Sequence, residues 1–113
     1  MAEVFNRVST ELTTSAITDV YTAPAADAGD RAVILGCVAA NVNGAGGVTV
    51  TIDITNAGLT KQSSIAKDIV VPSGSSLEFV ANKLVLKQGE KLRATASSAN
   101  SIDITISALE ITA

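Results

Sequence analysis

Two aspartates in a repeated four-residue sequence are the first candidates for chemistry in this chain. Ile-Asp-Ile-Thr occurs at residues 52–55 and again at 102–105, so Asp53 and Asp103 have matching neighbours. A pair of carboxylates can share a proton or bind a divalent cation. In both copies, however, the aspartate alternates with isoleucines and stands beside threonine, as solvated strand residues do. We therefore expect both aspartates to face solvent or a neighbouring subunit, and we predict no metal site.

Other routes to catalysis lack an essential partner. The chain has no histidine, which is the commonest general base and metal ligand in proteins. Serine and lysine occur together in Lys-Gln-Ser-Ser (61–64), but nothing there distinguishes a site from a polar loop. The glycine-rich residues 43–47 lead into a strand pattern, and lack the Gly-Lys-Ser/Thr of a phosphate loop, so we expect a hairpin turn. We predict no enzymatic activity, no cofactor and no small-molecule substrate.

Composition narrows the class of protein further. The 8 basic and 11 acidic residues give a net charge of −3 without a basic cluster, which argues against nucleic-acid binding. Three aromatic residues are too few for a sugar-stacking platform, and the single Cys37 cannot form an intrachain disulfide. We see no signal-peptide pattern and no apolar run near the ~18 residues of a membrane helix, so we expect no membrane association.

Alternation with a period of two residues dominates the chain and predicts an all-β fold. Residues 48–55 (VTVTIDIT) alternate apolar and polar side chains throughout, and Gly/Pro/Asn-rich breaks recur at short intervals. We expect an antiparallel β-sandwich, either jelly-roll or immunoglobulin-like, of seven to eight short strands. The expected strands are 15–22, 31–42, 48–55, 64–71, 77–80, 83–87, 91–97 and 101–112.

Two of these strands depart from simple alternation. Residues 32–42 (AVILGCVAANV) are apolar on both faces, which fits either a central strand covered within the chain or one covered by another subunit. In the last strand, Leu109 and Ile111 fall on the face that Asp103 and Thr105 occupy earlier. Either a bulge restores the phase there, or a neighbouring molecule buries that second face.

The N-terminal residues show no strong strand period. We expect residues 1–14 to form an N-terminal arm and residues 15–113 to form the sandwich. The first dozen residues fit either an amphipathic arm that docks on a partner, or a frayed end or short first strand. The expected subunit interface combines apolar residues from both ends of the chain: Val4, Phe5, Val8, Leu12, Leu109 and Ile111.

The order of several segments resembles small β-sandwich virion structural proteins of tailed bacteriophages. The segments are DVYTAPA (19–25), AVILGCVAANVNG (32–44), PSGSSLEF (72–79), NKLVLKQGEKLRATAS (82–97) and SIDITISALEI (101–111). The positions that match the family's turns are Tyr21 and Pro24, Pro72 and Gly74, and Gly89 and Glu90. Each of these residues has a backbone or packing role rather than a catalytic one.

The resemblance implies a non-enzymatic subunit of the virus particle that assembles in the host cytoplasm. Its partners would be itself, as a homo-oligomer expected to be a trimer, and larger particle proteins that it stabilises. A capsid cement or decoration protein is the favoured role. The alternatives are a neck, tail, baseplate or fibre component, or a receptor- or carbohydrate-binding module.

Overall fold

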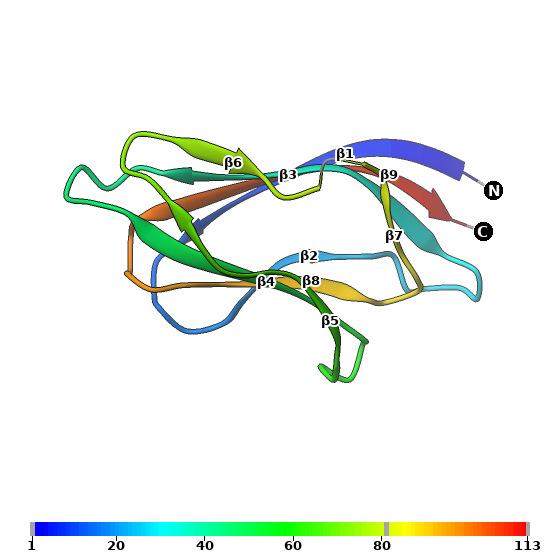
Figure 1. The fold of residues 1–113 in the computed structure, drawn as a ribbon. Helices are drawn as coiled ribbons and strands as arrows, with labels where there is room; N and C mark the ends of the chain where they lie inside the picture. Colours follow the sequence, from blue (N-terminus) through cyan, green and yellow to red (C-terminus); the bar gives the residue numbers. More distant parts are fainter. Residues whose placement is uncertain (1, 81, 113) are drawn as a thin grey trace.

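The computed structural model describes residues 2–80 and 82–112, and these contain nine β-strands and no helix (Figure 1). The strands are β1 (Ala2–Leu12), β2 (Thr18–Thr22), β3 (Arg31–Asn41), β4 (Val48–Thr55), β5 (Lys61–Val71), β6 (Ser76–Glu78), β7 (Leu84–Leu86), β8 (Lys91–Ala96) and β9 (Ile102–Thr112). Within these ranges no helix is long and apolar enough to cross a membrane.

The strands form two antiparallel sheets that pack face to face. Sheet A has the order β1-β9-β3-β6, with β7 also paired to β3, and sheet B has the order β2-β8-β4-β5. Figure 1 shows them as two layers, with the first strand β1 and the last strand β9 side by side in sheet A. The predicted all-β antiparallel sandwich is confirmed.

The strand order is that of a jelly roll rather than an immunoglobulin-like domain. The chain pairs as one long nested hairpin, because β1 pairs with β9, β2 with β8, β3 with β6 and β7, and β4 with β5. Rolling this hairpin brings β9 against β3 and β8 against β4, which completes both sheets. A double-sheet jelly roll is built in this way.

Aliphatic side chains from the inner faces of both sheets make the core. β9 contributes Ile102, Ile104, Ile106 and Ala108, all buried, and β4 contributes buried Val50 and Ile52 from the opposite sheet. Burying a large aliphatic side chain stabilises a fold by about 1.5–3 kcal/mol. The predicted alternation of residues 48–55 therefore holds, except that Thr55 at its end is also buried.

No bulge in β9 restores the phase of its apolar residues, so the first of the two expected explanations is wrong. The register of β9 against β1 runs without a shift, so Leu109 and Ile111 lie on the outer face of sheet A. The register against β3 shifts between Ile34 and Gly36, which makes Leu35 the extra residue. Leu109 and Ile111 are thus outward-facing apolar residues in an unbroken strand.

The glycine-rich loop at residues 43–47 joins the two sheets and does not close a hairpin, contrary to expectation. β3 belongs to sheet A and β4 to sheet B, so the loop crosses between them. Buried Asn41 holds it: its Nδ2 donates to the carbonyls of Gly46 (2.9 Å) and Val71 (2.8 Å). A phosphate loop is excluded because a strand, not a helix, follows the glycines.

Residues Ala2–Leu12 form β1, a strand that the sequence does not clearly predict. β1 pairs residue for residue with β9 from Ala2↔Thr112 to Leu12↔Ile102. The sequence leaves open a docking arm or a frayed end or short first strand. The structure has a first strand, and at 11 residues it is longer than expected. Whether residues 1–14 also act as a separable arm remains a prediction.

Candidate functional site

The two aspartates of the repeated sequence lie on opposite sides of the molecule. Asp53 is on the outer face of sheet B, where its Oδ1 accepts a hydrogen bond from the Ser64 hydroxyl at 2.6 Å. Asp103 is on the outer face of sheet A, opposite Glu11 of β1. Among the described residues, no group of three or more Asp, Glu, Cys or His side chains is placed to hold a metal ion.

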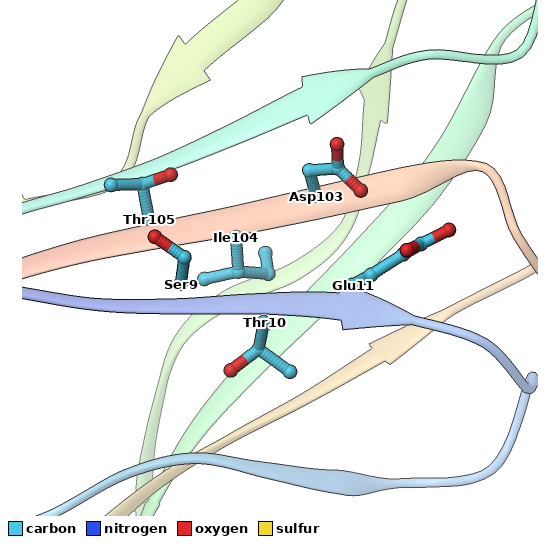
Figure 2. A pocket seen from close by; sticks show the side chains of 6 residues that line it. All are labelled: Ser9, Thr10, Glu11, Asp103, Ile104 and Thr105. Carbon is cyan, nitrogen blue, oxygen red and sulfur yellow. The ribbon is translucent and has the colours of Figure 1, made fainter.

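An open groove of about 390 Å³ runs along β1 and β9 beside Asp103 (Figure 2). Its lining residues are Ser9, Thr10, Glu11, Asp103, Ile104 and Thr105. The register places Glu11 directly opposite Asp103, and like charges in that position are destabilising. The polar side chains of the groove are carboxylates and hydroxyls, beside Ile104, and its shape is too open to exclude water from a reaction.

The Lys-Gln-Ser-Ser segment does not form an activated nucleophile. Its residues are exposed at the start of edge strand β5. The Lys61 ammonium donates a hydrogen bond to the Ser64 hydroxyl at 3.4 Å. The Ser64 hydroxyl donates its own hydrogen to Asp53 Oδ1 at 2.6 Å, so that hydrogen is not directed at Lys61 as a base would require.

Cys37 is buried on the inner face of sheet A and is chemically protected. Burial raises the pKa of its thiol to about 12, and the negative charge of Glu78 contributes to the rise. The same Glu78 accepts a hydrogen bond from the backbone N–H of Cys37 at 3.2 Å. Because the thiolate is the reactive form, this cysteine is a small core residue rather than a nucleophile.

The most distinctive surface feature is a row of apolar side chains across the outer face of sheet A. Phe5 of β1 lies opposite Leu109 of β9, Leu109 opposite Val33 of β3, and Val33 opposite Val85 of β7. Directly opposed residues share one face of a sheet. We call Phe5, Leu109, Val33 and Val85 the apolar row.

The apolar row is only partly covered within the chain. Phe5 is 75% exposed and Val85 is 56% exposed, while Leu109 and Val33 between them are half-buried. Ile111, the next outward residue of β9, is also half-buried and widens the row. Contiguous exposed apolar surface of this kind marks an interaction site more often than scattered single residues do.

The six residues expected at the subunit interface divide between the two faces of sheet A. Phe5, Leu109 and Ile111 lie together on the outer face, in or beside the apolar row. Val4, Val8 and Leu12 are on the inner side of β1. Leu12 is fully buried in the core and Val8 packs against it, whereas Val4 remains 56% exposed.

Sequence reasoning missed Val33 and Val85 as members of this surface. The available signal was that residues 32–42 are apolar on both faces, which already implied a covered outer face. The neighbours of Val33 could not be read from the sequence, because β7 and β9 reach it from residues far along the chain.

A partly buried hydrogen bond ties the two sheets together beneath this surface. The Tyr21 hydroxyl of β2 donates to Oε2 of Glu110 on β9 at 2.6 Å, and Asn6 Nδ2 donates to the same oxygen at 3.3 Å. Burial, and then this bond to the Glu110 carboxylate, hold the pKa of Tyr21 well above its usual range. The residues of two segments quoted for the phage resemblance thus meet in space.

No model of a known protein family matches the chain, and no curated protein sequence matches it either. Solved structures do share its fold. A structure from a study of Bacillus endospore appendages, described as disulfide-linked pili, has a TM-score of 0.57 at 19% identity, covering 97% of this chain and 88% of that one. A chain of the capsid of Helicobacter pylori bacteriophage KHP30 has a TM-score of 0.56 at 8% identity, covering 100% and 90%.

A third similar structure comes from infectious bursal disease virus strain Gx. It has a TM-score of 0.51 at 12% identity and covers 97% of this chain but 32% of the viral one, so the likeness is to one part of that longer protein. Identities this low establish a shared fold and nothing about activity. The chain therefore has a jelly-roll fold that also occurs in a phage capsid structure, in part of a second virus structure and in a bacterial pilus structure.

Proposed function

We propose that this protein is a non-enzymatic structural subunit of a bacteriophage particle that associates with copies of itself and with larger particle proteins. Capsid cement or decoration is the favoured position, and a trimer is the expected oligomer. The protein would be assembled into the virion in the host cytoplasm. The observation that carries the proposal is the apolar row, because it places side chains of the kind normally found in a protein core on the outer face of sheet A.

The energetics of the apolar row favour assembly over an isolated monomer. An apolar side chain contributes about 25 cal/mol for each Å² removed from water, so an exposed Phe5 and Val85 are an unused source of stability. Interfaces between permanently associated subunits are enriched in such residues and depleted in charge. Many copies joined through modest contacts of this kind gain strength from avidity.

The chemistry of the remaining surface supports a structural role. The chain offers no histidine, and its one cysteine is protected in the core. The similar structures come from a phage capsid, a virus and pili, which supports a subunit of a large assembly. The sequence resemblance to tailed-phage virion proteins makes the phage particle the favoured assembly among these.

Mass spectrometry of gradient-purified particles tests the proposal. We expect this chain at a copy number comparable with that of other structural proteins, and we expect it to separate with capsids rather than tails. Recovery with tails or fibres would instead favour the neck, tail, baseplate or fibre alternative. Absence of the chain from purified particles would refute a virion role.

A pilus-like fibre is the second candidate, and the likeness to the endospore appendage structure favours it. Electron microscopy of the purified protein distinguishes the two, because a fibre subunit is expected to form filaments alone. Linkage of copies through Cys37 is not expected in either case, because that thiol is buried.

A further inference from the structure

The outer edge of β1 differs from the other sheet edges of the described residues. β2 has five residues and an irregular register, and the β6/β7 edge is split into two strands of three residues each. β5 is long, but its register against β4 shifts at three places, and it carries exposed Lys61 and Lys67. Short strands, bulges and lysines are devices that protect edges from pairing with other chains.

β1 has none of the backbone devices. It pairs with β9 through eleven consecutive residues without a register shift, and within residues 2–80 and 82–112 no strand of sheet A pairs with its opposite edge. The Leu12 carbonyl accepts a hydrogen bond from Asn100 N–H (2.9 Å), so it points toward the β9 side. By the two-residue period of a strand, Glu3, Phe5, Arg7, Ser9 and Glu11 direct their N–H and C=O groups toward the free edge.

The charges on β1 restrict how two copies of this edge can pair. Glu3, Arg7 and Glu11 lie at intervals of four residues on the outer face, with signs that alternate. In an antiparallel pair related by a two-fold axis, only the residue on the axis lies opposite its own copy. Centring on Arg7 would oppose Arg7 to itself and Glu3 to Glu11, and like charges directly opposite are destabilising.

Two registers place opposite charges together. Centring on Phe5 opposes Glu3 to Arg7 twice, and centring on Ser9 opposes Arg7 to Glu11 twice. Only the first also places Phe5 against Phe5, and an aromatic pair is a favourable cross-strand contact. It joins the apolar rows of both copies end to end, so that Phe5 loses its exposure.

We propose that the free edge of β1 binds the β1 strand of a second copy, antiparallel, with the two-fold axis at Phe5. The pairing joins the two A sheets into one continuous sheet, with residues 2–8 of each copy in contact. It specifies one contact of the self-association in the proposed function. A two-fold contact cannot close a trimer, so in a trimeric subunit this pairing joins one trimer to the next.

Cysteine substitution reads the register directly. Opposed residues in an antiparallel pair have Cα atoms about 4.5–5.5 Å apart, within the roughly 4.4–6.8 Å that a disulfide spans. Phe5→Cys should therefore give a covalent dimer when treated with diamide, whose azo bond takes up the two electrons and two protons released by the thiols. Arg7→Cys and Ser9→Cys are matched controls on the same face. The wild-type protein shows how much crosslinking comes from the native Cys37.

We expect at least ten times more covalent dimer from Phe5→Cys than from either control, at low micromolar protein on a non-reducing gel. Preferential crosslinking of Arg7→Cys or Ser9→Cys would overturn the proposed register. Equal background crosslinking of all three folded variants would overturn the pairing itself.

A charge exchange tests the same contact with Phe5 retained. Glu3→Arg or Arg7→Glu alone should weaken association at least ten-fold in sedimentation velocity, and the double variant should return to within about three-fold of wild type. Rescue of Arg7→Glu by Glu11→Arg instead would place the axis at Ser9 and refute the proposal. If the chain is found in virions but the charge variants associate as strongly as wild type, only the edge pairing is refuted. If the charge variants behave as expected but the chain is absent from virions, only the proposed function is refuted.

Discussion

Replacing Tyr21 with phenylalanine removes one hydroxyl from the interior and tests the link between the two sheets. The ring still fills its place in the core, so the change isolates the 2.6 Å hydrogen bond to Glu110. A hydrogen bond to a charged group contributes about 1.5–3 kcal/mol to stability. Because Asn6 also donates to the same oxygen, we expect a loss near the lower end, about 1.5–2 kcal/mol.

The effect should be visible in thermal unfolding and should depend on pH. For a chain of this size, about 1 kcal/mol corresponds to roughly 4 °C, so we expect a melting temperature about 6–8 °C lower. The folded state raises the pKa of Tyr21 above its unfolded value of about 10. The stability contributed by the neutral hydroxyl is therefore complete below pH ~10 and is lost as the pH rises further.

The composition of the chain makes the assay unusually clean. Tyr21 is the only tyrosine and there is no tryptophan, so phenolate absorbance near 295 nm reports this residue alone. In wild type, phenolate should appear together with the loss of far-ultraviolet circular dichroism, and the Tyr21→Phe variant should lose stability less steeply above pH ~10. A Glu110→Gln variant, which keeps an acceptor oxygen, completes a double-mutant cycle.

Two results would refute this reasoning. The first is a Tyr21→Phe variant whose free energy of unfolding lies within about 0.5 kcal/mol of wild type, as for an ordinary surface change. The second is a phenolate that titrates near pH ~10 while the protein stays folded, because a buried, carboxylate-bonded hydroxyl cannot ionise so readily.

The remaining predictions concern the two faces of sheet A and its N-terminal strand. Leu12→Ala should lower the free energy of unfolding by about 2–5 kcal/mol in urea titrations, because the side chain is fully buried, and a loss below about 1 kcal/mol would contradict that placement. Phe5→Ala should change monomer stability by less than about 0.5 kcal/mol yet reduce self-association in light scattering, and an unchanged oligomer would argue against the apolar row. The Cys37 thiol should react with Ellman's reagent only at the rate of unfolding, and rapid labelling of the native protein would show that it is accessible. Deleting residues 1–12 removes buried Leu12 and should cost at least as much stability as Leu12→Ala, whereas an equally stable truncated chain would establish a separable arm.

The sequence predicts well those strands in which apolar side chains alternate with polar ones only because one face packs in the core and the other meets solvent. The sequence predicts residues 48–55 with the bounds of β4, because one face is apolar and the other polar over nearly the whole strand. The sequence does not define β1, for the opposite reason. Phe5 is an apolar residue on its polar outer face, and Asn6 and Thr10 are polar residues on its inner side. The residue that obscured the strand pattern is thus one that belongs to the candidate interaction surface.

Pairings between distant segments could not be predicted from local pattern. The phase change near Leu109 is visible in the sequence, but the sequence does not show which strands flank Leu109, nor the bulge at Leu35 of β3. The bond between Tyr21 and Glu110 joins residues 89 positions apart, and it forms only because the rolled hairpin brings β2 beneath β9. Such contacts follow from topology, which local side-chain periodicity does not specify.

The pairing of Ala2 with Thr112 also sets how the molecule responds to pulling. Both ends of the chain leave the same end of an antiparallel pair, whose hydrogen bonds run perpendicular to the strands. Tension between the termini would therefore break these bonds one at a time, as in a zipper, and peel β1 from β9 at low force. Tension between the Ala2 end of β1 and the Ile102 end of β9 would act parallel to the strands. It would load all eleven residue pairs together and meet far greater resistance. A tether intended to survive mechanical stress should therefore not pull this domain by its two ends.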